Sequence, residues 1–188
     1  MIEGRGQQQS FAMRAMRGEA MPVPLAPHLL SSPLEYLYAD HLRQRSVCAI
    51  LRRIAAEGRV AAHEAAALAS FLERDLILHH EDEERGLFPL IIKRSAGEDR
   101  LEADLARLAQ DHKRVRPQIM RLADILTHAA PEIGAADAPL FTGFAAHELR
   151  HLAFESGVVL PIARVRLTRK DITELSRDMR ARRGIAAP

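Results

Sequence analysis

Apolar residues recur every three or four positions from residue 101 to residue 126, interrupted only by His112, and this spacing constrains the fold more than any other feature. Alternating steps of three and four put these side chains on one face of an α-helix, the seam along which helices pack in a bundle. A helix with such a stripe must bury it against neighbouring helices. The stripe consists of Leu101, Leu105, Leu108, His112, Val115, Ile119, Leu122 and Leu126.

Three other segments carry a comparable stripe. The first runs from Pro33 to about Glu57, because serines precede it as a cap and Gly58 follows it. The others span about 61–94 and 138–167, and Pro89 predicts a kink or a break in the former. Four long amphipathic segments with short connections predict an all-α fold, an antiparallel up-down-up-down four-helix bundle.

The sequence outside these segments suggests three regions. Residues 1–30 are rich in Gly, Gln and Pro and predict a flexible N-terminal tail. Residues 31–168 form the bundle, and residues 169–188 form a C-terminal tail with a short amphipathic helix expected over 171–182.

Composition excludes several classes of protein. The chain is 47% hydrophobic and 28% charged with a net charge of +2, which suits a soluble globular protein and gives no reason to expect nucleic acid binding. No run of about 18 apolar residues is present and no signal peptide is recognisable, so no membrane association is expected. The single cysteine, Cys48, suits a reducing cytoplasm and is expected to be a core residue.

Several of the nine histidines interrupt the apolar stripes. One core histidine is explained by a hydrogen-bonded partner, but a histidine on the inward face of all four helices requires a common cause. A shared metal site is the simplest cause. The inward histidines are His41, His79, His112, His147 and His151.

Two glutamates extend the pattern. His79 and Glu83 are four residues apart and share a helix face, and His151 and Glu155 repeat this spacing. A proline follows each glutamate after five residues, which suggests an internal two-fold. Four imidazoles and two carboxylates are too many for one tetrahedral zinc but fit two ions with bridging carboxylates. The expected metal ligands are His41, His79, Glu83, His112, His151 and Glu155, with His147 as a candidate extra ligand.

These motifs resemble the hemerythrin-like, His-His-Glu (HHE) cation-binding family. The matching elements cover roughly residues 33–167, and they are Asp40-His41, His79-x3-Glu83-Glu84-x3-Phe88-Pro89, His112 and His151-x3-Glu155-x5-Pro161. The resemblance implies a four-helix bundle with two iron ions, bridged by carboxylates and by an oxo or hydroxo group, with zinc as a substitute. Such sites bind or sense oxygen, store iron, or handle nitric oxide and damaged iron centres.

One position differs from the oxygen carriers of the family. They have a second histidine on the third helix where this chain has Arg116, so the ligand set is more similar to the bacterial branch. We therefore expect a cytoplasmic di-iron protein, a monomer or homodimer, that binds, senses or reacts with O2, NO or peroxide. Whether it turns over a substrate is left open.

Two other functions remain open. One is a metal-dependent regulatory module that binds a protein partner without turnover. The other is a zinc hydrolase, because His147-Glu148-Leu149-Arg150-His151 has the form HExxH, in which the glutamate acts as general base. In the di-iron interpretation, Glu148 is expected to face solvent.

Some neighbouring residues also receive an expected role. Asp75 is expected to contact the ring N–H of His79, on the side away from the metal. His80 and Glu84 are expected to form a surface or interface pair. Two arginines, Arg45 and Arg116, each lie four residues from an expected ligand and either cover the mouth of the site or extend to solvent.

Overall fold

The computed structural model describes residues 21, 23–95, 101–128 and 132–186. Within these ranges the regular secondary structure is helical, and β-pairing is limited to an isolated bridge between Arg59 and Glu132. The all-α prediction is therefore confirmed. None of the described helices is both long enough and apolar enough to cross a membrane.

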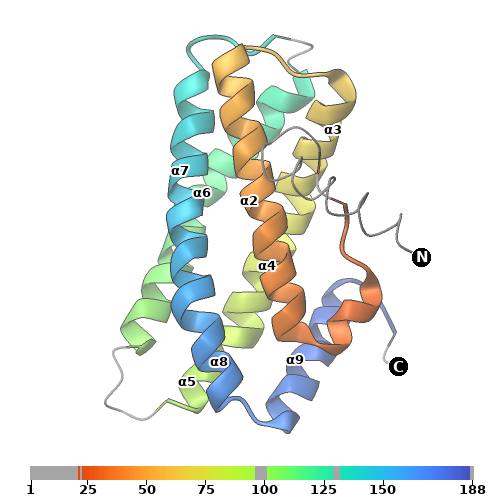
Figure 1. The fold of residues 1–188 in the computed structure, drawn as a ribbon, viewed down its shortest axis with the longest axis vertical. Helices are drawn as coiled ribbons and strands as arrows, with labels where there is room; N and C mark the ends of the chain where they lie inside the picture. Colours follow the sequence, from red (N-terminus) through yellow and green to blue (C-terminus); the bar gives the residue numbers. More distant parts are fainter. Residues whose placement is uncertain (1–20, 22, 96–100, 129–131, 187–188) are drawn as a thin grey trace, which may run out of the picture.

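Four long helical runs make up most of the described chain (Figure 1). The first is α2, Pro33–Glu57, and the third is α6, Leu101–His128. The second run consists of α3 (Ala62–Ser70), the π turn η2 (Phe71–Asp75), α4 (Leu76–Asp82), the π turn η3 (Glu83–Leu87) and α5 (Phe88–Lys93). The fourth consists of α7 (Ala138–Phe154), the π turn η4 (Glu155–Val159) and α8 (Leu160–Arg166).

A proline follows each of the π turns η3 and η4, whereas η2 has none and Pro117 lies inside α6 without a π turn. Inside an α-helix, a proline ring clashes with the carbonyl four residues earlier. A π turn widens the helix by one residue just before Pro89, so that the amide of Phe88 bonds to the carbonyl of Glu83. The amide of Leu160 bonds to the carbonyl of Glu155 in the same way, just before Pro161. The disturbance expected near Pro89 therefore takes the form of a π turn.

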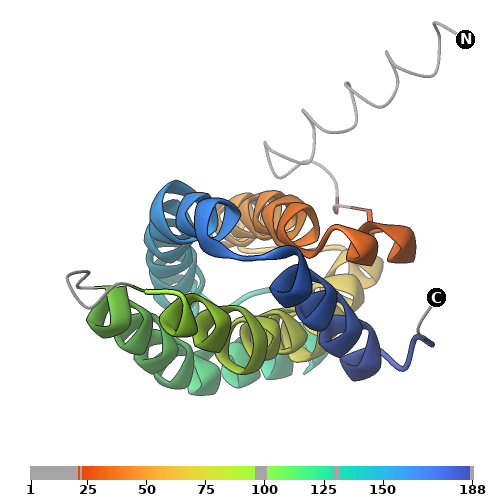
Figure 2. The ribbon, with the colours of Figure 1, turned by 90° about the horizontal axis from the view of Figure 1, so that it is seen from below.

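The four runs lie around a common interior (Figure 2). The α2 helix packs along α7, and α3 packs along α6, while α5 contacts both α6 and α8. Among the described residues, the interior contains two apolar clusters, one including Leu51 and Phe144 and the other including Leu37 and Leu105. On each run, the inward histidine lies between residues of one cluster and residues of the other.

Two shorter helices close one end of the molecule. The 3-10 helix η1, Pro27–Ser31, buries Leu30 completely, and Ser176 donates a 2.6 Å hydrogen bond to the carbonyl of Leu30. Ser176 belongs to α9, Arg169–Arg182, which confirms the short helix expected near the C-terminus. Most of the tail expected over residues 1–30, namely 1–20 and 22, lies outside the described residues.

Buried ion pairs hold α9 against the second run. Asp82 is completely buried and accepts a 2.7 Å hydrogen bond from Nε of Arg182 and a 2.6 Å bond from Arg183. A capping box between Thr168 and Asp171 starts the helix. The ion pairs with Asp82 hold α9 over η3, the turn that begins with Glu83.

Candidate metal centre

The structure brings all six expected ligands into one cluster in the interior. One histidine comes from each of α2, α4, α6 and α7, and the two glutamates are the first residues of η3 and η4. All six are buried, with exposed fractions of 0% for Glu83 and Glu155 and at most 6%, for His151. The side chains form two groups of potential metal ligands, His41, His79, Glu83 and Glu155 in one and Glu83, His112, His151 and Glu155 in the other.

Glu83 divides its two carboxylate oxygens between these groups. Its Oε1 lies 3.6 Å from Nε2 of His41 and 3.5 Å from Nε2 of His79. Its Oε2 lies 3.5 Å from Nε2 of His112. A carboxylate oriented in this way can bridge two cations.

Glu155, on the fourth run, divides its two carboxylate oxygens in the same way. Its Oε2 lies 3.6 Å from Nε2 of His41, whereas its Oε1 lies 2.8 Å from Nε2 of His151 and 3.9 Å from Nε2 of His112. Both glutamates therefore present one oxygen to each pair of histidines. Within each group the ligand atoms lie within 4.8 Å of one another.

The cluster contains buried polar atoms that the described residues do not satisfy. These atoms are Nε2 of His41, Nε2 of His79 and both carboxylate oxygens of Glu83 and Glu155. Buried carboxylates without hydrogen bonds are costly unless a positive charge compensates them. The donor set and its unsatisfied atoms fit two cations.

The histidines themselves carry the compensating charge when no metal is bound. Burial would lower the pKa of His79, but the carboxylates of Glu83 and Asp40 raise it to about 10. Burial would likewise lower the pKa of His151, but Glu155 raises it to about 9. Protons and metal ions therefore compete for the same nitrogens.

The comparison with protein families agrees with this geometry. A family model described as the hemerythrin HHE cation binding domain matches residues 32–163. The chain belongs to this family. No curated protein and no solved structure matches the chain. As a hemerythrin-like domain, the chain is a metal-binding protein of a type that typically holds iron, and its buried His/Glu groups could hold a metal.

Three histidines of this hemerythrin-like domain have a partner behind the ring. Nδ1 of His41 lies 2.9 Å from the hydroxyl of Ser156. Nδ1 of His79 lies 3.1 Å from Oδ2 of Asp40. Such partners fix the ring orientation and the tautomer, so that Nε2 stays available to a metal. The third pair, at 2.9 Å, is Nδ1 of His112 and Oε1 of Glu84.

The expected contact between Asp75 and His79 is wrong. Asp75 accepts a 2.8 Å hydrogen bond from Arg43, and Arg43 donates a 2.7 Å bond to Asp40, which contacts His79. The carboxylate behind His79 is therefore Asp40, and Asp75 lies two contacts further out. The sequence carried a signal for this arrangement, since Asp40 directly precedes His41 in the family motif.

The expected surface pair of His80 and Glu84 is also wrong. His80 is buried, and its ring stacks on His112 with centroids 3.9 Å apart and an interplanar angle of 7°. Burial, together with the neighbouring His112, lowers the pKa of His80 well below its ordinary value. His80 and Glu84 therefore support His112 from two sides.

Glu148 is buried rather than exposed to solvent, so that expectation is wrong. Its exposed fraction is 3%, and burial raises the pKa of its carboxyl group. Burial, and then the nearby Glu148, raise the pKa of the Cys48 thiol, which is buried as expected. The HExxH glutamate therefore points into the interior, where a general base would not meet a substrate from solvent.

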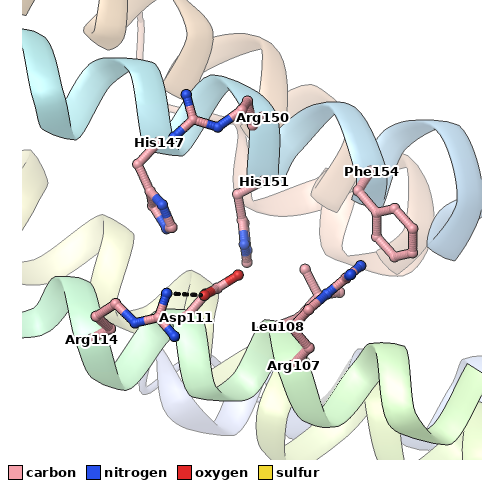
Figure 3. A pocket seen from close by; sticks show the side chains of 8 residues that line it. All are labelled: Arg107, Leu108, Asp111, Arg114, His147, Arg150, His151 and Phe154. Carbon is pink, nitrogen blue, oxygen red and sulfur yellow. Dashed lines mark ion pairs between the residues drawn. The ribbon is translucent and has the colours of Figure 1, made fainter.

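His147 lies at a surface cavity of about 490 Å³ between α6 and α7 (Figure 3). Neither Arg45 nor Arg116 lines this cavity: Arg45 donates a 3.2 Å hydrogen bond to the carbonyl of Leu152, and Arg116 is exposed. Three other arginines line the cavity, namely Arg107, Arg114 and Arg150, and the sequence pattern does not predict them there. The lining residues are Arg107, Leu108, Asp111, Arg114, His147, Arg150, His151 and Phe154.

Proposed function

We propose that the protein binds two iron ions in its core and uses them to bind, sense or react with O2, NO or peroxide. The observation that carries the proposal is that both buried glutamates present one oxygen to each of two histidine pairs. The proposed ligands are His41, His79, Glu83, His112, His151 and Glu155.

The proposal includes an antiparallel four-helix bundle over residues 31–168, with residues 1–30 and 169–188 outside it. The packing of α2 along α7 and of α3 along α6 supports this bundle. We also propose that the protein works in the cytoplasm, where a reducing environment suits its single buried thiol, Cys48.

The chain's own residues would shape the chemistry at this site. Iron held by the six proposed ligands would supply the redox chemistry for a diatomic molecule or a peroxide. Ser156, Asp40 and Glu84 hold the tautomers of their histidines, and the apolar clusters on both sides limit the access of water. Glu148, whose Oε1 has no hydrogen-bond partner among the described residues, can hold a proton in the interior.

A regulatory module is the second candidate, and one contact favours it. The α9 helix packs against η3, and Asp82, to which it is anchored, directly precedes Glu83. A metal-dependent movement of Glu83 would therefore reach α9, where a protein partner would sense it. This candidate predicts partner binding that depends on metal and shows no turnover.

Metal content and visible absorption test the main proposal. The full chain is loaded with Fe²⁺ under anaerobic conditions, freed of excess metal, measured and then exposed to air. We expect about two tightly bound irons per chain and a new near-ultraviolet absorption band after exposure. Glu155→Gln should lower the iron content, whereas His128→Ala, which removes an exposed histidine of α6, should not.

One zinc per chain with no spectral response would overturn the di-iron proposal. Iron binding that His41→Ala and His79→Ala leave unchanged would place the metal elsewhere. Iron binding without any response to air, NO or peroxide, together with metal-dependent partner binding, would favour the regulatory module.

A further inference from the structure

A buried metal centre needs a route by which cations reach it. His41, Glu83 and Glu155 are completely buried, and His79 and His112 are 1% and 3% exposed. His151 is the most exposed of the six proposed ligands, and it lines the cavity between α6 and α7. That cavity is therefore where solvent comes closest to the proposed ligands.

Two further potential ligands meet His151 in this cavity. Asp111 of α6 and His147 of α7 are each half-buried, and each has a ligand atom within 4.8 Å of one on His151. His147 and His151 are four residues apart, so both rings point from α7 toward α6, where the Asp111 carboxylate lies (Figure 3). Two imidazoles and one carboxylate are a set that non-haem Fe²⁺ accepts with positions left open.

The ring of His151 differs from the other three proposed ligand rings. Its Nε2 faces the core, 2.8 Å from Glu155 and 2.9 Å from Nε2 of His112. Its Nδ1 is buried and has no hydrogen-bond partner among the described residues. Each of the other three rings has a side-chain oxygen within 3.1 Å of Nδ1, whereas Nδ1 of His151 has none among the described residues, so this ring nitrogen is available to a further cation.

We propose that Asp111, His147 and His151 form a third divalent-cation site, from which cations pass to the two core sites. This proposal rests on the proposed metal-binding function of the core. His151 belongs to both sites, so a cation held at the cavity is already next to a core ligand. A neutral imidazole has one lone pair for a metal, so binding cations on both nitrogens of His151 at once requires loss of the ring proton to solvent, which keeps the third site weak while the core is filled.

The charges around the third site make it weak and reversible. Asp111 forms a 3.2 Å ion pair with Arg114, which a cation must displace. Arg107 and Arg150 also line the cavity and repel a cation there. Weak binding suits a site that passes metal on, because a tight site would retain it.

Metal titration tests the third site, with Co²⁺ as a spectroscopic probe. The metal-free full chain should take up two equivalents tightly and a third weakly. In His147→Ala and in Asp111→Asn, the third equivalent should weaken by at least about tenfold while the two tight equivalents remain. His128→Ala is the matched control, because it removes an exposed histidine of α6 and should leave all three equivalents in place.

The rate of loading tests the transfer route. Stopped-flow mixing of the metal-free chain with Co²⁺ should show slower filling of the core in His147→Ala, by at least about tenfold, with the same final core content. Arg114→Ala should strengthen the third site by roughly twofold to fivefold, because it frees Asp111 from an exposed ion pair. Arg121→Ala, which breaks the similar pair with Asp124 on the same helix, should have no effect.

The outcomes separate the two proposals. If His147→Ala keeps the wild-type stoichiometry and loading rate, the third site is refuted while the core stands. If His147→Ala loses a tight equivalent, His147 is a core ligand and the third site is again refuted. If the wild-type chain binds no tight equivalent, the core proposal fails, and the transfer route fails with it.

Discussion

At the scale of single residues, the centre depends on what lies behind each histidine. A ligand ring that is free to rotate or to change tautomer binds metal less tightly than one held by a hydrogen bond. In this chain a hydroxyl, an aspartate and a glutamate occupy those positions behind three of the rings. Because Glu84 is only part-buried, its contribution can be measured without disturbing the core.

Glu84→Ala should weaken metal binding at the core by about 10- to 100-fold, because His112 loses the carboxylate that orients its ring. Competition with a chelator measures this change. Glu81→Ala is the control, since Glu81 has the same 32% exposed side chain but pairs with Arg85 on the surface. Equal affinities in the two variants would show that Glu84 does not support His112.

The raised pKa values of two histidines predict how pH affects the metal-free chain. His79 has a pKa of about 10 and His151 of about 9, both raised from 6.5. A histidine with a raised pKa contributes stability that is fully present below pH 6.5. This contribution is lost as the pH rises through the pKa values of the folded chain. We expect urea denaturation of the metal-free chain to show falling stability between pH 6.5 and pH 10. Unchanged or rising stability would contradict these pKa shifts.

The stability that metal binding adds depends on pH in the opposite direction. Over the same pH interval, the histidine nitrogens lose their protons and become available to a cation. The metal-bound chain should therefore gain stability relative to the metal-free chain as the pH rises.

At the scale of elements, the helix widens into a π turn between each of the two glutamates and the proline that follows it. The π turns η3 and η4 both begin at a proposed ligand glutamate, and both directly precede a proline-containing helix. The repeated Glu-x5-Pro motif thus coincides with the same local distortion at two places in the site. The α9 helix then covers the first of these turns.

Gly86→Ala tests the docking of α9 on η3. A Cβ at this position would lie 2.7 Å from Cδ1 of Leu175 and 3.2 Å from Arg182, both on α9. Leu175 is completely buried and has little room to move, so we expect a loss of about 1–3 kcal/mol in the free energy of unfolding. Urea denaturation measures the loss.

Gly143→Ala is the matched control for this substitution. Gly143 lies inside α7, and a Cβ there would meet nothing within 4 Å. Alanine should therefore stabilise the chain by about 0.5–1 kcal/mol through helix propensity alone. If both variants were stabilised, α9 would not be packed closely on η3.

At the scale of the whole molecule, metal binding and folding are linked. The proposed ligands come from all four helical runs, so they are assembled only in the folded chain. A cation that binds the folded chain alone must stabilise it by mass action.

Free metal at about 100 times its dissociation constant should stabilise the chain by about 2.7 kcal/mol. Thermal unfolding under anaerobic conditions, with and without Fe²⁺, measures this as a rise in Tm, and a chelator should reverse it. A variant with both Glu83→Gln and Glu155→Gln should lose most of the rise. An equal rise in that variant would mean that the metal stabilises the chain elsewhere.

The sequence by itself determined the helical character and the family. Apolar steps of three and four predict the helices, and Pro33–Glu57 was predicted with the bounds that α2 has. The six proposed ligands were also named from the sequence, because a polar residue inside an apolar stripe must face the interior, and the structure brings all six together.

Only the tertiary structure decided what surrounds those ligands. The helical period fixes the side of a helix on which a residue lies, but the depth of burial depends on the neighbouring runs. Glu148 and His80 were therefore expected at the surface and are buried, against α2 and α6 respectively. A π turn also adds one residue and rotates the following helix by roughly 100°, which a fixed period cannot anticipate. The contact of Asp40 with His79 and the cavity at His147 each join separate helices, and only packing brings such residues together.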